Sequence, residues 1–280
     1  MKKEQNLAGI DSSSAWDVPP LREAVIDSDG SAWDRKTEEI IEKYKRIIVL
    51  RGAGSVNGID KKAADELLEK DLLPRIKREL ESGAVAIMFD GDSDSPDKPD
   101  VGYIMGRLRD ELRQELDDSV LFATAQKKSW YYPAEPGTNL ANTHGLQYET
   151  YVFEDGKFPG EHNRFTQSER LVNADGYEQW YIGASGPIAS EQLQDYNAKI
   201  EGDKKHRVVV FRAPLNEALS DDIAKKLEAA KVSQDQSKIT KLEGALEQRK
   251  HKYGVPWDDS GNPIVDASKY PHLEFEFVTK

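Results

Sequence analysis

The chain contains no cysteine. This absence excludes disulfides, thiolate metal ligands and a cysteine nucleophile, and it fits a cytoplasmic protein. No apolar run approaches the ~20 residues that a membrane-spanning helix needs. No apolar segment follows Lys2 and Lys3, as a secretory signal would require. The sequence therefore predicts a cytoplasmic protein with no membrane partner.

The chain also has fewer basic than acidic side chains. Lys and Arg number 39 against 51 Asp and Glu, so the formal net charge is −12. Nucleic acids and anionic membranes are bound through Lys and Arg side chains that neutralise phosphate, so we expect no nucleic-acid partner. With 280 residues, of which 38% are hydrophobic, the chain is long enough to bury a sizeable core.

Apolar runs without polar alternation are typical of strands buried on both faces of a parallel sheet. Such runs occur at residues 47–50, 85–89, 120–123, 179–182 and 208–211. Segments with helical spacing of apolar residues separate them, except between 123 and 179. This alternation predicts a three-layer α/β fold with a mostly parallel, open, Rossmann-like sheet.

Three further segments set the expected domain organisation. Residues 1–32 are mixed and polar, and predict an N-terminal arm ahead of a single α/β domain at 33–280. Residues 133–176 break the alternation, and an extended stretch at 146–153 before Asp155-Gly156 predicts a β-hairpin insertion. Two amphipathic segments within 217–250, separated by SQDQS, predict a C-terminal helical hairpin.

An acidic loop follows the predicted strand at 85–89. Asp90, Asp92 and Asp94 come directly after the apolar run, with further aspartates at 97 and 100. Carboxylates this close repel one another unless water, a cation or a hydrogen-bond donor offsets them. Their alternate spacing can direct several oxygens at one hard cation, so we predict an Mg²⁺ site here, with Asp90 and Asp92 also catalytic.

This run resembles the strand-then-D-x-D motif of haloacid-dehalogenase-type phosphatases, which would make Asp90 a nucleophile and Asp92 an acid/base. It is also similar to the D-x-D of Toprim domains and to the first five positions of an EF-hand calcium loop. The phosphatases carry the motif on their first strand, Toprim domains place Glu where this chain has Arg51, and the EF-hand's Gly and Glu are missing. The run therefore assigns no family, and a solvated turn that caps the next helix remains an alternative.

A glycine-rich loop, RGAGSVNG, follows the strand at 47–50. It contains Gly52, Gly54 and Gly58, and Asp60 then predicts the start of a helix. Glycines let the backbone approach an anion, and a helix N-terminus adds N–H donors, so we predict an anion-binding loop. An ordinary glycine turn without a ligand is the alternative.

A second loop of this kind, GASGPIAS, follows the strand at 179–182 and contributes Ser185 and Gly186 as candidate ligand-binding residues. Arg51, Arg212 and the lysines at 127 and 128 also follow predicted strands, where they could hold a phosphate or carboxylate. His144 precedes the expected hairpin and is a candidate general acid or base.

In an open parallel sheet these loops all lie at the carboxyl edge, where ligands bind. The sequence therefore predicts an Mg²⁺-dependent enzyme that acts on a phosphorylated or nucleotide-like anionic small molecule by phosphoryl transfer or hydrolysis. One alternative is an NAD(P)-dependent oxidoreductase, in which the glycines would hold pyrophosphate and Asp90 the ribose. The other is a non-catalytic binding or assembly module that uses the arm and the helical hairpin. The sequence leaves homo-oligomerisation open.

Overall fold

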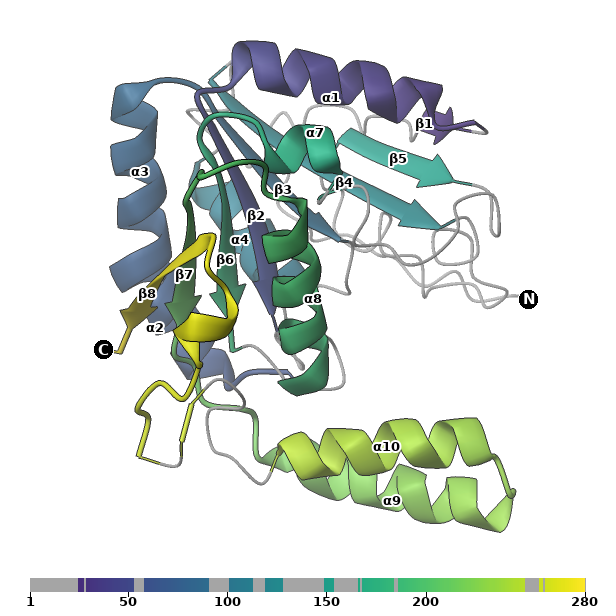
Figure 1. Ribbon diagram of the computed structural model, residues 1–280. Coiled ribbons are helices and arrows are strands. Elements are labelled where there is room, and N and C mark those ends of the chain that lie inside the picture. The colour runs from purple at the N-terminus through teal and green to yellow at the C-terminus, as the bar shows by residue number, and fades with distance from the viewer. Residues whose placement is uncertain are drawn as a thin grey trace, which may run out of the picture.

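The computed structural model describes residues 25–27, 29–52, 58–90, 101–112, 119–127, 149–153, 166, 168–183, 186–249, 257–258 and 260–279. Within these ranges, eight strands form one sheet in which all paired neighbours run parallel (Figure 1). The strands are β1 (Val25–Asp27), β2 (Arg46–Gly52), β3 (Val85–Asp90), β4 (Val120–Lys127), β5 (Glu149–Phe153), β6 (Tyr177–Ile182), β7 (His206–Phe211) and β8 (Leu273–Val278).

Helices alternate with most of these strands. They are α1 (Ser31–Lys43), α2 (Lys61–Leu67), the π-helical turn η1 (Leu68–Leu72), α3 (Leu73–Ser82), α4 (Val101–Glu111), α7 (Glu169–Val172), α8 (Gly186–Lys199), α9 (Ala218–Val232), α10 (Gln236–Gln248) and the 3-10 turn η4 (Ala267–Lys269). None of these helices is both long and apolar enough to cross a membrane.

The sheet has helices on both faces, which confirms the predicted three-layer α/β architecture. One core cluster joins α1, α7 and α8 to one face, through side chains such as Ile40, Leu171 and Tyr196. The other joins α2, α3 and α4 to the opposite face, through side chains such as Ile76 and Ile104. All the apolar runs singled out in the sequence are strands, because a strand covered on both faces buries every side chain.

The strand order is β1-β5-β4-β3-β2-β6-β7-β8. From β2 the chain proceeds through β3, β4 and β5 in one direction, and then returns to place β6 on the other side of β2. The order therefore reverses between β2 and β6. Such a reversal leaves a crevice at the carboxyl ends of the two strands, because the loops that follow them lead to opposite faces of the sheet.

Two segments take a different place from the one expected. Glu149–Phe153 is strand β5 of the main sheet, parallel to both β4 and β1, so at residues 151–153 neither of its edges is left for a hairpin partner. The Asp155-Gly156 turn lies outside the described residues. Within the expected arm, Val25–Asp27 forms edge strand β1, and α1 already begins at Ser31.

The predicted C-terminal helical hairpin is formed by α9 and α10, which project from the body (Figure 1). Its apolar residues, including Ile223, Leu227 and Leu242, form a cluster separate from those of the sheet. Asp235 caps α10 by accepting a hydrogen bond from the Lys238 N–H. The hairpin is therefore a substructure with a core of its own.

Candidate functional site

The ends of β2, β3 and β6 lie next to one another at the carboxyl edge. Leu50 of β2 pairs with Phe89 of β3, one residue before Asp90, and Gly52 pairs with Ile182 of β6. The glycine-rich loop and the acidic loop thus leave from neighbouring strands. Gly52 on β2 and Ile182 on β6 mark the strand ends between which ligands of such sheets bind.

Glycine is required at both sides of this crevice. Gly52 has φ 148°, and a Cβ there would lie 1.9 Å from the Ile182 carbonyl oxygen. Gly183 has φ 51°, and a Cβ there would lie 2.6 Å from Ile59 Cγ2. Side-chain-bearing residues rarely adopt these backbone conformations, and the available space does not admit a methyl group. Gly52 therefore lets the end of β2 lie close against the end of β6, and Gly183 lets the segment after β6 lie close against Ile59.

The exit of the glycine-rich loop is held by the segment that leads into the helical hairpin. The Asn216 N–H donates to the Gly58 carbonyl at 2.9 Å, and the Asp60 N–H donates to the Pro214 carbonyl at 2.9 Å. These bonds fix the backbone between the loop and α2. The loop is therefore anchored at both ends, by β2 and by residues 214–216.

The start of α2 is capped from within the chain. Asp60 accepts a hydrogen bond from the Ala63 N–H at 2.9 Å, which confirms the predicted N-cap. This donor is already used, so the first turn of α2 offers a ligand fewer free N–H groups than the sequence suggested. Any anion held by this loop must rely on other donors.

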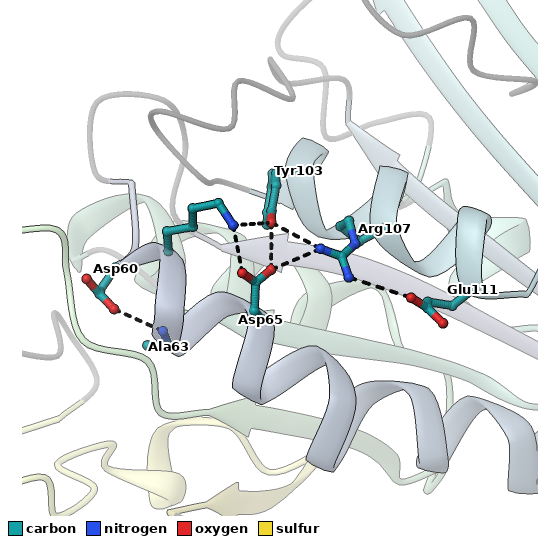
Figure 2. A network of polar contacts seen from close by, with 7 residues as sticks. Asp60, Ala63, Asp65, Tyr103, Arg107 and Glu111 are labelled. Carbon is teal, nitrogen blue, oxygen red and sulfur yellow. Dashed lines mark hydrogen bonds and ion pairs between the residues drawn. The ribbon is translucent and has the colours of Figure 1, made fainter. Parts of the chain in front are cut away.

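A polar network joins α2 to α4, the two helices that follow the glycine-rich loop and the acidic loop (Figure 2). Asp65 lies at its centre. Its Oδ2 accepts from Lys61 Nζ at 2.7 Å, and its Oδ1 accepts from the Tyr103 hydroxyl at 2.6 Å and from Arg107 Nη1 at 3.3 Å. Lys61 also donates to the Tyr103 hydroxyl at 3.2 Å.

The network favours the ionised carboxylate. Partial burial opposes ionisation of Asp65, but hydrogen bonds from Lys61 and Tyr103 outweigh it and lower the pKa of Asp65. The hydrogen bond to Asp65 in turn raises the pKa of Lys61. Both groups therefore stay charged at neutral pH and hold the first turns of α2 and α4 at a fixed separation. This cross-link positions the ends of both loops.

Arg51 does not extend into solvent at the edge. It is buried, with 4% of its surface exposed, and its Nη2 donates to Thr166 Oγ1 at 2.9 Å. Tyr177 donates to the Thr166 carbonyl at 2.6 Å, Gln179 donates to the Tyr177 hydroxyl at 3.0 Å, and Tyr181 donates to Gln179 at 2.7 Å. This buried chain of hydrogen bonds holds Thr166, the partner of Arg51, and so fixes a permanent positive charge near the carboxyl end of β2.

Arg212 is tied to the C-terminal segment. Its Nη1 donates to the Gly261 carbonyl at 3.2 Å, and its Nη2 donates to the Thr279 carbonyl. These contacts fasten the end of β8 and the preceding loop to β7. They give Arg212 a structural role, and its predicted contact with a ligand stays a prediction.

The other predicted residues are placed in part or not at all. Gly186 is the first residue of α8, beside the crevice, while Asp90 and Lys127 are placed only as the last residues of β3 and β4. The remaining candidates lie outside the described residues: Gly54, Asp92, Asp94, Lys128, His144 and Ser185. In the described part of the chain, no three His, Asp or Glu side chains form a cluster that could hold a metal ion.

Sequence reasoning missed the network around Asp65 and the hydrogen-bonded chain along β6. The first leaves a weak signal in the four-residue spacing of Lys61 and Asp65, and of Tyr103 and Arg107. The second leaves one in the polar residues at alternate positions of β6. Neither pattern indicates which elements of the fold contact each other.

Comparison with models of known protein families finds no match, and comparison with curated proteins finds no significant match. Function therefore has to be argued from the site itself.

Proposed function

We propose that this chain binds a phosphorylated or nucleotide-like small molecule in the crevice between β2 and β6 and catalyses an Mg²⁺-dependent reaction on it. The observation that carries the proposal is the reversal of strand order at β2 and β6, with a glycine turn at the end of β2. Ligands of open parallel sheets bind at such reversals, outside the carboxyl ends of the strands.

In this proposal, three parts of the chain have separate roles. The glycine-rich loop takes an anionic group of the ligand through its backbone N–H groups. Asp90, Asp92 and Asp94 hold Mg²⁺, which neutralises charge that develops on the transferred group. Arg51 acts from below as a fixed positive charge, because its hydrogen bond to Thr166 keeps the guanidinium in place.

The test compares two variants of the acidic loop. Melting temperatures of the wild type, Asp92→Asn and Asp97→Asn are measured with ADP or ATP, each with and without Mg²⁺. A ligand that binds only the native state raises the melting temperature. We expect an Mg²⁺-dependent increase in the wild type and in Asp97→Asn, and its loss in Asp92→Asn. Asp97→Asn removes the same charge from the same loop and so serves as the matched control.

Two results would contradict the proposal. One is a wild-type protein whose melting temperature does not respond to nucleotide or Mg²⁺ at millimolar concentrations. The other is an Asp92→Asn variant with an unchanged response.

A dinucleotide-dependent oxidoreductase is the second candidate. Strands β4-β3-β2-β6-β7-β8 have the order found in dinucleotide-binding sheets, and Asp90 ends the strand next to β2, the position of the acidic residue that binds ribose. This candidate predicts that NAD or NADP binds without Mg²⁺, and that Asp90→Asn weakens binding while Asp92→Asn does not. Fluorescence titration of the wild type and both variants with NAD and with NADP separates the two candidates.

A further inference from the structure

A cavity of about 270 Å³ lies away from the carboxyl edge, on the face of the sheet that α3 covers. Its walls come from α3 and from three adjacent strands, β6, β7 and β8. The lining residues are Arg75, Arg78, Glu79, Trp180, Arg207 and Glu276. Arg207 is the second residue of β7, so the cavity opens over the middle and amino half of these strands rather than over their carboxyl ends.

Both carboxylates of the cavity wall are already engaged. Glu276 accepts from Arg207 Nε at 3.0 Å and forms an ion pair with Arg75 Nη1 at 2.7 Å. Glu79 pairs with Arg46 Nε at 2.9 Å. Two of the three lining arginines, Arg75 and Arg207, are therefore already paired with Glu276.

Arg78 is the exception among these arginines. Its Nε donates to the Pro74 carbonyl at 3.4 Å, and no carboxylate within the described ranges lies at ion-pair distance. Three arginines and two glutamates line the cavity. With Arg46, the partner of Glu79, and Glu178, a partner of Arg207, there are four arginines and three glutamates. The cavity thus has an excess of positive charge in a chain whose formal net charge is −12.

An aromatic ring beside the cavity holds Arg75 in place. Arg75 lies over the Phe211 ring, 5.7 Å from the ring centroid, and Trp180 is 1% exposed beneath the cavity. Stacking on an aromatic ring holds a guanidinium plane in one orientation at little cost in hydration. Positioned guanidinium groups are suited to oxyanions, since each offers two parallel N–H donors.

We propose that this cavity binds the phosphate group of a small molecule, with Arg78 as its main charge partner and Arg75 and Arg207 as neighbouring donors. The cavity volume suits a phosphate with a short substituent rather than a whole nucleotide. The site is separate from the crevice between β2 and β6, and it does not depend on the function proposed for that crevice.

The test titrates the full chain with inorganic phosphate and, separately, with glycerol phosphate, at low ionic strength by calorimetry. We expect saturable binding in the wild type and an affinity at least ~10-fold weaker in Arg78→Gln, because a charge-assisted hydrogen bond is lost. Arg78→Lys keeps the charge and should recover part of the affinity. The anion that binds with the higher affinity shows whether the site prefers free or esterified phosphate.

Lys62→Gln is the control, because it removes one exposed positive charge from α2, outside the cavity lining. It should bind phosphate like the wild type. The proposal is overturned if the wild type binds neither anion, if Arg78→Gln binds as tightly as the wild type, or if Lys62→Gln loses affinity to the same extent. Thermal melts confirm that each variant is folded, which we expect because Arg78 is exposed.

Discussion

Glu178 shows how a single residue is governed by its surroundings. It lies on β6 with 2% of its surface exposed, and its Oε2 is 3.4 Å from Arg207 Nη1. Burial raises the pKa of Glu178, and the charge of Arg207 only partly offsets this. Because the folded protein binds this proton more tightly than the unfolded chain does, the stabilising contribution is complete below the ordinary glutamate pKa. It is lost as pH rises through the raised value.

Glu178→Gln should therefore change how stability depends on pH. The amide does not titrate, so the stability of the variant relative to the wild type should increase as pH rises from about 4 to 8, across the range that begins at the unfolded glutamate pKa. Urea unfolding at a series of pH values measures this difference. Glu274→Gln changes the same group at an exposed position of β8 and should follow the wild-type profile. A constant difference between Glu178→Gln and the wild type would show that the pKa is not raised.

At the scale of elements, the helical segment between β2 and β3 shows how local rules combine. Pro74 has no N–H and its ring would clash with the preceding turn of an α-helix. The chain widens into the π-helical turn η1 just before it and resumes as α3, which Gly83 ends. Pro74 and Gly83 are local signals for the interruption and for the end. The sequence did not predict that Asp65, one turn earlier, would join this segment to α4.

Asp65→Ala should lower the free energy of unfolding by about 1–3 kcal/mol, since the Tyr103 hydroxyl and Arg107 lose a charged acceptor. The control is Glu66→Ala on the same helix, which removes an exposed partner of Lys70 and should cost clearly less. Chemical denaturation measures both. In combination with Tyr103→Phe, the loss from Asp65→Ala should shrink, because the two residues share one interaction. Equal losses in the two alanine variants would contradict a special role for this network.

At the scale of the whole molecule, the chain consists of a body with two core clusters and a hairpin with a third. The hairpin is closed at its base by Arg249, which donates to Ser220 Oγ at 2.9 Å and to the Asn216 carbonyl. Residues 214–216, which hold the exit of the glycine-rich loop, lie outside α9 and α10. Substructures with separate cores can open independently of each other.

Replacing residues 218–248 with a short Gly/Ser linker should therefore leave the body folded, with its thermal transition shifted by only a few degrees, roughly what a 1 kcal/mol change causes. Circular dichroism should show the loss of helix and a retained cooperative transition. Leu227→Ala, inside the hairpin core, should also leave that transition in place, whereas Ile48→Ala in β2 should lower it clearly. Unfolding of the body on excision would show that the hairpin is part of its core.

The sequence by itself determined the layered α/β class, the buried strands, the Asp60 cap, the Gly83 stop and the helical hairpin. These are local properties: an uninterrupted apolar run such as residues 85–89 must be covered on both faces, and a cap is decided by its nearest neighbours. Only the tertiary structure decided the strand order, the place of β5 between β1 and β4, the burial of Arg51 and the charged cavity beside α3. Each of these depends on which distant segments pair. The spacing of apolar residues indicates how far a segment is buried, but it does not indicate which other segment covers it.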